Sequence, residues 1–348
     1  MIRTPPTTSA SSCNTQSANC PPSSRRRTPT SDAVAKPGAP SLLANWRQYI
    51  PYLGFVLIFA FFSATLYNQG FLDPNNLLNI LRQTAMISIM AVGMTYVLAA
   101  GEIDLSIGMV AGLISLVAAV AMDHYGAAAG VIAALLVGGL VGLINALLTT
   151  RVGIPSFLTT LAMMGIARGT AMWMTQTKSV PILDDNFIWL FGGGNLGRIP
   201  VLVIWTLIIA IIGHIVLRRT TFGRRVLATG GSETAARYSG IDTRGIKMRV
   251  LIISSLGAAI AGMLYAGRLH SGRFQLGEGD ELSVIAAAVL GGTSLFGGAG
   301  SVVGSIVGSL MIGVINNGLL LMGLEYSQQL IARGIIIIVA VAISQSRK

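Results

Sequence analysis

Long apolar runs separated by short polar links fill the chain from Arg47 onward. A helix needs about 20 apolar residues to cross a bilayer core, and runs such as Val201 to Leu217 are continuously apolar rather than alternating, which argues against a β-barrel. The pattern predicts an all-α, polytopic helical membrane protein with about ten transmembrane helices. The expected spans are residues 47–68, 84–100, 105–122, 128–150, 155–175, 200–217, 249–268, 283–298, 302–322 and 327–345.

The second, third and eighth of these segments are short and interrupted by glycine. Backbone polar groups at membrane depth must be satisfied by protein or by water in a cavity. We therefore expect these three segments to form broken or re-entrant helices.

Composition supports the membrane assignment. Of the 348 residues, 53% are apolar and 11% are charged, and the mean hydropathy is +0.70. These values exclude a water-soluble globule and a disordered chain. The net charge of +11 would suggest a nucleic-acid partner in a soluble protein, but the basic residues flank the predicted spans. The positive-inside rule accounts for them, and we expect no nucleic-acid partner.

The distribution of charge also orients the chain. The loop from Arg218 to Arg249 contains eight basic residues and only two acidic ones, and basic loops stay on the cytoplasmic side. Ten spans place both termini on the same side as this loop, so both are expected in the cytoplasm. Residues 1–44, rich in Ser, Thr and Pro, are expected to form a disordered cytoplasmic tail, and residues 45–348 the membrane domain, with 218–248 as its cytoplasmic loop.

Within this loop, residues 230–240 have the pattern of one short helix. Ser232 can cap it, Glu233 and Arg237 suit its positive and negative ends, and Gly240 can close it in the left-handed conformation. Such a helix is marginal alone in water. Exposed alanines and a tyrosine would let it lie in the groove of a soluble partner, and the alternative is that it rests on its own bundle or on lipid.

Two carboxylates, Glu102 and Asp104, lie between two apolar segments. Ionisable groups at membrane depth are costly and are functional candidates by default. If the break lies at the membrane surface, these groups could instead be hydrated or cap the next helix. The sequence leaves both readings open.

Three asparagines, Asn145, Asn316 and Asn317, lie within apolar runs and must find hydrogen-bond partners there. Bridging between helices is the more frequent role of such residues, and contact with a polar solute is the alternative.

Motifs for catalysis and for cofactors are lacking. The glycine-rich run 291–300 has no lysine in the position that a phosphate-binding loop requires, so we interpret it as close helix packing with an unwound segment. The three histidines lack metal-ligand spacing, and no GxSxG or HExxH motif occurs. We expect no enzyme activity, no cofactor and no metal.

A faint internal repeat is also present. VLAAGEIDLSIGMVAG (97–112) is similar to VLGGTSLFGGAGSVVG (289–304), and GLIN followed by IARG occurs at 142–145 and 166–169, with GVIN and IARG at 313–316 and 331–334. Duplicated halves are common in transporters.

Several of these stretches resemble the membrane permease subunit of bacterial ABC importers of the ribose and simple-sugar type. GEIDLSIGM resembles the family's GGIDLSVG, with Glu102 where the family usually has Gly. IPSFLTTLAMMGIARG (154–169), TFGRRVLATGGSETAARYSGI (221–241) and the segment 286–323 are similar to further family stretches. Together they cover about residues 75–345 in order.

The resemblance implies the ABC importer permease fold and a role as a transport subunit in the bacterial inner membrane. The expected partners are a second permease subunit, identical or paralogous, ATP-binding cassette subunits that hydrolyse ATP, a periplasmic sugar-binding protein and the lipid bilayer. The loop helix matches the family's coupling helix, with Ser232, Glu233, Ala235, Ala236, Arg237, Tyr238 and Gly240 as candidate contacts to the ATPase. A monosaccharide would pass by alternating access along a pathway that includes Asp104, Ser106, Asn316 and Asn317.

Three alternatives to a sugar importer stay open. An ion-coupled secondary transporter would use Glu102 and Asp104 as ion ligands but leaves the loop helix unexplained. An ABC permease for a non-sugar substrate such as branched-chain amino acids is the second alternative. A membrane scaffold that docks partners without transport is the third.

Overall fold

The computed structural model describes residues 50–325, 327–332, 334, 335 and 338. The expected tail, residues 1–44, and most of the expected tenth span lie outside this part of the chain. The α-helices are α1 (Ile50–Thr65), α2 (Pro74–Ala99), α3 (Ile107–Tyr125), α4 (Ala127–Leu147), α5 (Ser156–Thr175), α6 (Asp185–Ile188), α7 (Val201–Arg219), α8 (Thr221–Gly231), α9 (Glu233–Tyr238), α10 (Thr243–Leu269), α11 (Asp280–Leu290) and α12 (Val302–Leu321).

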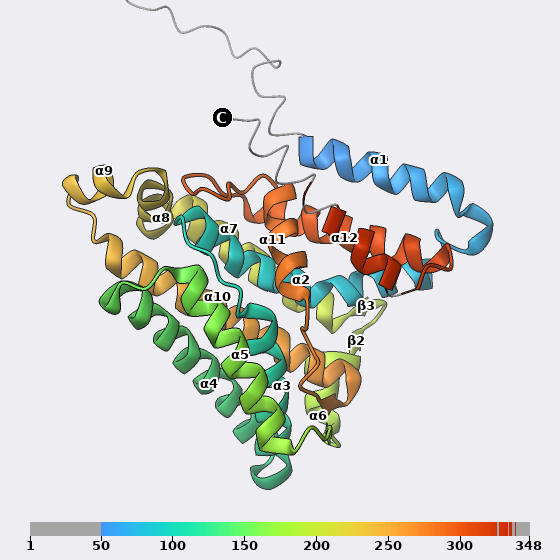
Figure 1. The fold of residues 1–348 in the computed structure, drawn as a ribbon. Helices are drawn as coiled ribbons and strands as arrows, with labels where there is room; N and C mark the ends of the chain where they lie inside the picture. Colours follow the sequence, from blue (N-terminus) through green and yellow to red (C-terminus); the bar gives the residue numbers. More distant parts are fainter. Residues whose placement is uncertain (1–49, 326, 333, 336–337, 339–348) are drawn as a thin grey trace, which may run out of the picture. The chain divides into compact units, whose positions relative to one another are not determined.

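Short elements join these helices (Figure 1). A 3₁₀ turn, η2 (Tyr67–Gln69), follows α1, and two π-helical turns, η3 (Leu148–Val152) and η4 (Trp189–Gly193), follow α4 and α6. The described residues also contain two antiparallel pairs of short strands: β1 (Val180–Pro181) with β4 (Ser271–Gly272), and β2 (Asn195–Leu196) with β3 (Ile199–Pro200).

Within the described residues, six helices are long and apolar enough to cross a membrane: α2, α3, α4 extended through η3, α7, α10 and α12. This agrees with the predicted polytopic helical architecture, but the predicted number of about ten spans is not confirmed. The described part of the first segment contains the 16-residue helix α1. The eighth forms α11, which ends at Leu290 after 11 residues, so a break does occur in that segment.

The second and third segments, in contrast, are not broken. α2 runs without interruption for 26 residues and α3 for 19. Their glycines serve close packing instead: a Cβ added at Gly93 would lie 3.1 Å from the backbone of Ser254, and one at Gly112 would collide with the carbonyl oxygen of Leu276. Small residues let neighbouring segments approach in this way, so the expectation of broken helices was wrong at these two places.

Helices α2 and α10 form the centre of the bundle. Every residue of α2 from Thr84 to Ala99 is buried, and α10 packs against α2, α3 and α4. Glycines bring α4 close to α10, since a Cβ at Gly138 would lie 2.6 Å from Ala259 Cβ. Helix α12 packs on α2 and α11, and α1 lies along α12 (Figure 1).

The two copies of the internal repeat lie side by side. The N–H of Gly298 donates a 3.0 Å hydrogen bond to the carbonyl oxygen of Ala99. In each copy a helix, α2 or α11, closes with a glycine at positive φ, Gly101 at 81° and Gly292 at 90°, followed by a non-helical link to the next helix. The repeat therefore encodes the same local feature twice, a helix end and a non-helical link.

Candidate functional site

The link between α2 and α3, residues 100–106, is non-helical, yet Glu102, Asp104 and Ser106 within it are buried in the bundle. Its backbone is satisfied by side chains of α5, because Ile103 N–H donates to Ser156 Oγ at 3.1 Å and Leu105 N–H donates to Thr160 Oγ1 at 3.0 Å. Irregular backbone inside a helical bundle is tolerated where protein groups satisfy it in this way. The link is thereby held in one place between α2, α3 and α5.

Asp104 is the centre of a buried polar cluster. Its Oδ1 accepts hydrogen bonds from the backbone N–H and the hydroxyl of Ser106, at 2.9 and 2.6 Å, and its Oδ2 accepts one from the Ser254 hydroxyl at 2.7 Å. Asn145 donates to Ser106 Oγ at 3.1 Å. All four side chains are fully buried. We call these four residues the Asp104 cluster; it joins the 100–106 link to α4 and α10.

Burial excludes one of the possibilities that the sequence left open for Asp104, a carboxylate in contact with bulk water. The carboxylate is not hydrated, and among the described residues no cation lies within ion-pair distance of it. Nor does the described part of the chain hold a group of three His, Cys, Asp or Glu side chains arranged for a metal ion. Hydrogen bonds from neutral groups alone hold this carboxyl group.

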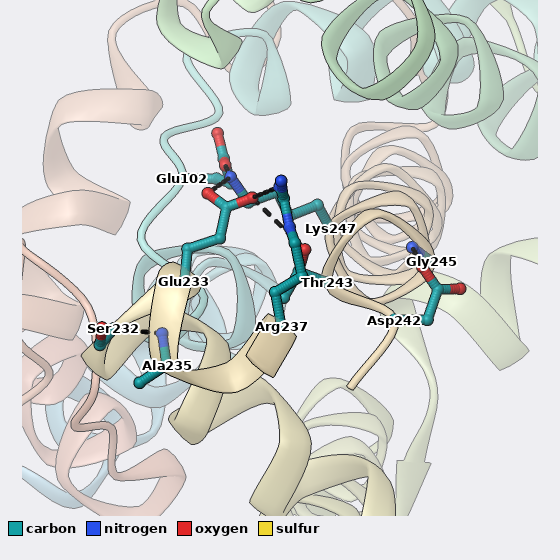
Figure 2. A network of polar contacts seen from close by, with 9 residues as sticks. All are labelled: Glu102, Ser232, Glu233, Ala235, Arg237, Asp242, Thr243, Gly245 and Lys247. Atoms are coloured by element: carbon teal, nitrogen blue, oxygen red, sulfur yellow. Dashed lines mark hydrogen bonds and ion pairs between the residues drawn. The ribbon is translucent and has the colours of Figure 1, made fainter. Parts of the chain in front are cut away.

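Glu102 is tied to a different partner, at the start of α10. Lys247 Nζ lies 2.7 Å from Glu102 Oε1 and 2.7 Å from Glu233 Oε2 (Figure 2). The Lys247 and Glu102 side chains are only 19% and 9% exposed, whereas Glu233 is 39% exposed. One ammonium group therefore joins the 100–106 link to α9. We call these three residues the Glu102 bridge.

The remaining contacts of Glu233 strengthen its attachment. Arg237, one turn later in α9, pairs with Glu233 Oε1 at 3.1 Å, and the Thr243 hydroxyl donates to the same oxygen at 3.3 Å (Figure 2). The hydrogen bond from Lys247 is the main reason that the pKa of Glu233 lies below its ordinary value of 4.5. Glu233 is thus held as a carboxylate between two cations.

Helix α9 has the ends that its sequence predicts. Ser232 Oγ accepts from Ala235 N–H at 3.3 Å, and Gly240 closes the turn with φ 80°. The helix is shorter than expected, because Gly230 and Gly231 end α8 instead. Thr234, Ala235, Arg237 and Tyr238 are exposed, and Tyr238 is 89% exposed.

The prediction that both alanines are exposed was wrong for Ala236, which is buried at 4%. Successive residues of a helix point about 100° apart, so one alanine faces out while its neighbour faces the bundle. The helix therefore rests on its own protein through Ala236 and Glu233 and keeps an outward face free.

Backbone contacts also anchor the preceding helix, α8. A Cβ at Gly230 would collide with the carbonyl oxygen of Ala99 and would lie 2.7 Å from Gly298 N. Three segments thus meet without intervening side chains: the end of α8, the end of α2 and the glycine-rich link before α12. The sequence analysis interpreted the glycine-rich run 291–300 as close helix packing with an unwound segment, and this arrangement agrees with that interpretation.

The asparagines expected in a pathway lie elsewhere. Asn317 on α12 and Asn76 on α2 exchange two amide hydrogen bonds of 2.9 and 3.0 Å, and Asn316 is half-buried beside this pair. Asn76 lies near the start of α2 and Asp104 beyond its end. At 1.5 Å per residue, these sites are on the order of 35 Å apart. The structure brings Asp104 and Ser106 together, and it separates them from Asn316 and Asn317.

Two important contributors were missed in the sequence. Ser254 was not considered, and Lys247 was counted only as a loop charge. They are seven residues apart, which is two turns on one face of α10, and this spacing was the available signal. Nothing local to α10 shows that Glu102 and Asp104, about 150 residues earlier, lie on that face.

Comparison with known proteins covers most of the chain. Residues 76–341 match the family model described as branched-chain amino acid transport system / permease component. The chain is 39% identical over 299 residues to a ribose import permease protein of Bacillus subtilis, covering 85% of this chain and 92% of that protein.

Two further relatives are similar to this chain over most of their length. An L-arabinose ABC transporter permease protein of Azospirillum brasilense is 35% identical, covering 93% of this chain and 96% of its own. A D-allose transport system permease protein of Escherichia coli is 35% identical, covering 86% and 92%. With its apolar helices, this chain is a multi-pass membrane protein and belongs to the permease component family that the matching model describes.

Proposed function

We propose that this protein is the membrane permease subunit of an ABC importer for a monosaccharide. The observation that carries this proposal is near full-length similarity to three permeases named for ribose, arabinose and allose. The family description names branched-chain amino acids, but all three of these relatives are named for sugars. ATP hydrolysis then belongs to a separate ATP-binding subunit, and a periplasmic binding protein delivers the sugar.

The proposed location is the bacterial inner membrane, with both termini in the cytoplasm. The Arg-rich segments between α7 and α10 support this orientation through the positive-inside rule. The ends of α2 and α8, the Glu102 bridge and the link before α12 contact one another and so lie on one side of the bundle. In this orientation that side is cytoplasmic.

Helix α9 is the proposed coupling helix to the ATP-binding subunit. Its exposed face, formed by Thr234, Ala235, Arg237 and Tyr238, has a small residue beside a large aromatic one, a combination that fits a groove. Glu233 and Ala236 attach this helix to the bundle, and Ser232 and Gly240 set its ends.

A second permease subunit is proposed to complete the pathway. The pathway residues Asp104, Ser106, Asn316 and Asn317 would then lie at two depths, the asparagines toward the periplasm. Because a binding protein can supply the affinity, a weakly polar lining suits passage.

Uptake by cells that contain the complete transporter tests the substrate and the energy source. Radiolabelled D-ribose, L-arabinose and D-allose are offered separately, after ATP depletion or after collapse of the ion gradients. Uptake of at least one sugar that stops only with ATP depletion is the expected result. Uptake that stops only when the gradients collapse would favour an ion-coupled transporter and contradict the proposal.

The docking surface is tested by copurification of the ATP-binding subunit with an Ala235→Asp variant. The carboxylate would be buried in the proposed groove, so capture should fall sharply. Ala128→Asp is the control, since Ala128 is also an exposed alanine of a helix, α4. If both variants capture the ATPase equally, the contact is not on this face of α9.

A further inference from the structure

We propose that Glu102 is a positioning residue that transmits the movement of α9 to the Asp104 cluster through Lys247. This inference rests on the proposed function, in which α9 receives the ATP-binding subunit. In this proposal the Glu102 side chain connects α9 with the 100–106 link.

The first support is the geometry of the Glu102 bridge. Lys247 contacts both carboxylates at 2.7 Å, and it is largely shielded from water together with Glu102. Ion pairs shielded in this way are screened little by salt, and removing one partner leaves an uncompensated charge. If a docked subunit displaces Glu233, Lys247 must therefore either move with Glu233 or stay paired with Glu102 alone.

The second support is that α10 holds the link at two points. Lys247 contacts Glu102, and Ser254, two turns further along α10, donates to Asp104 Oδ2 at 2.7 Å. Glu102 and Asp104 are two residues apart in the chain. A shift at Glu102 therefore changes the position of a segment whose other end carries a buried carboxyl group.

The third support is that the Glu102 bridge is not needed to hold the neighbouring helices together. The backbone contacts among Gly230, Ala99 and Gly298 already fix α8 to α2. The bridge adds a side-chain connection to α9, the helix with the exposed face. A variant without the Glu102 charge should therefore fold, insert and bind the ATPase.

The test uses the complete transporter in liposomes, with a Glu102→Gln variant of the permease. Three quantities are measured: ATP hydrolysis without the sugar-binding protein, its stimulation by that protein loaded with sugar, and sugar uptake. The sugar is the one of D-ribose, L-arabinose and D-allose that the native transporter carries. Glu278→Gln is the matched control, because Glu278 forms a 2.8 Å ion pair with Arg168 that does not involve α9.

We expect Glu102→Gln to keep ATPase capture and unstimulated hydrolysis, and to lose stimulation by roughly 2- to 30-fold, the usual range for residues that carry coupling. Lys247→Met should also lose stimulation, and adding Glu102→Gln to Lys247→Met should cause no further loss. Glu102→Asp, which keeps the charge, should retain most of the stimulation, and Glu278→Gln should retain all of it.

Equal stimulation of native protein, Glu102→Gln and Lys247→Met would overturn the inference while leaving the proposed function intact. If Glu102→Gln fails to insert into the membrane, the stimulation of ATP hydrolysis is compared between the native protein, Lys247→Met and Glu102→Asp instead. A native transporter whose ATP hydrolysis does not respond to the loaded binding protein would overturn the proposed function, and this inference with it.

Discussion

The Ser254 hydroxyl on α10 donates a 2.7 Å hydrogen bond to the Asp104 carboxylate, across 150 residues of chain. Both side chains are fully buried. A carboxyl group in such surroundings depends on each of its donors, because water cannot replace a missing one. This contact fixes the end of the link between α2 and α3 to the central helix of the bundle.

Replacement of Ser254 by alanine should therefore destabilise the permease by about 1–3 kcal/mol, the cost of an unsatisfied buried acceptor. Thermal unfolding of the purified protein in detergent measures this. Ser63→Ala is the control, since the buried Ser63 hydroxyl has no hydrogen-bond partner among the residues that the structure describes. Equal melting temperatures of the two variants would show that the Ser254 bond contributes nothing.

The amide pair of Asn76 and Asn317 should behave as one unit. Each single alanine variant should lose most of the stability that the pair contributes, so the double variant should be less destabilised than the sum, with a coupling of about 0.6–1.7 kcal/mol. Unfolding by denaturing detergent measures all members of this cycle. The same cycle with Asn316 in place of Asn317 should be additive, and additivity in both would contradict the observed pairing.

The attachment of α9 should weaken in acid. The pKa of Glu233 is lowered in the folded protein, chiefly by its hydrogen bond from Lys247. A depressed carboxyl pKa stabilises the folded state above the ordinary value of 4.5, and this contribution is lost as the pH falls through the folded pKa. Hydrogen exchange of the α9 amides, corrected for intrinsic rates, should accelerate as the pH falls below the ordinary glutamate range.

Glu233→Gln provides the control for this pH effect. The variant cannot titrate at residue 233, so its exchange in α9 should already be faster at neutral pH and should change little on acidification. The same acceleration in the variant as in the native protein would assign the effect to another group.

Gly230→Ala should disrupt the junction of α8 with α2. The added Cβ would collide with the carbonyl oxygen of Ala99, and overpacking of this kind costs about 1–3 kcal/mol. Gly165→Ala is the control, because Gly165 is helical in α5 and has open space around it; it should be neutral or stabilising by up to about 1 kcal/mol. The yield and the melting temperature of the two purified variants are compared. A Gly230→Ala protein with native yield and melting temperature would contradict the close contact.

The sequence by itself determined the features that depend on local pattern. Apolar runs identified a polytopic helical membrane protein because crossing a bilayer requires length and hydrophobicity alone. Ser232 and Gly240 correctly marked the ends of the loop helix, and the glycines after Leu290 marked a break, because caps and left-handed turns are satisfied within a few residues.

Only the tertiary structure decided which side chains meet. The glycines of segments 84–100 and 105–122 were interpreted as signs of broken helices, but both helices are continuous there, and Gly93 and Gly112 are sites of close packing. The burial of Ala236 and the pairing of Lys247 with Glu102 also could not be read from local pattern. For Gly93 and Glu102 the deciding partner, Ser254 or Lys247, lies on α10 and is remote in the chain, and the packing of α10 against α2 brings it into place.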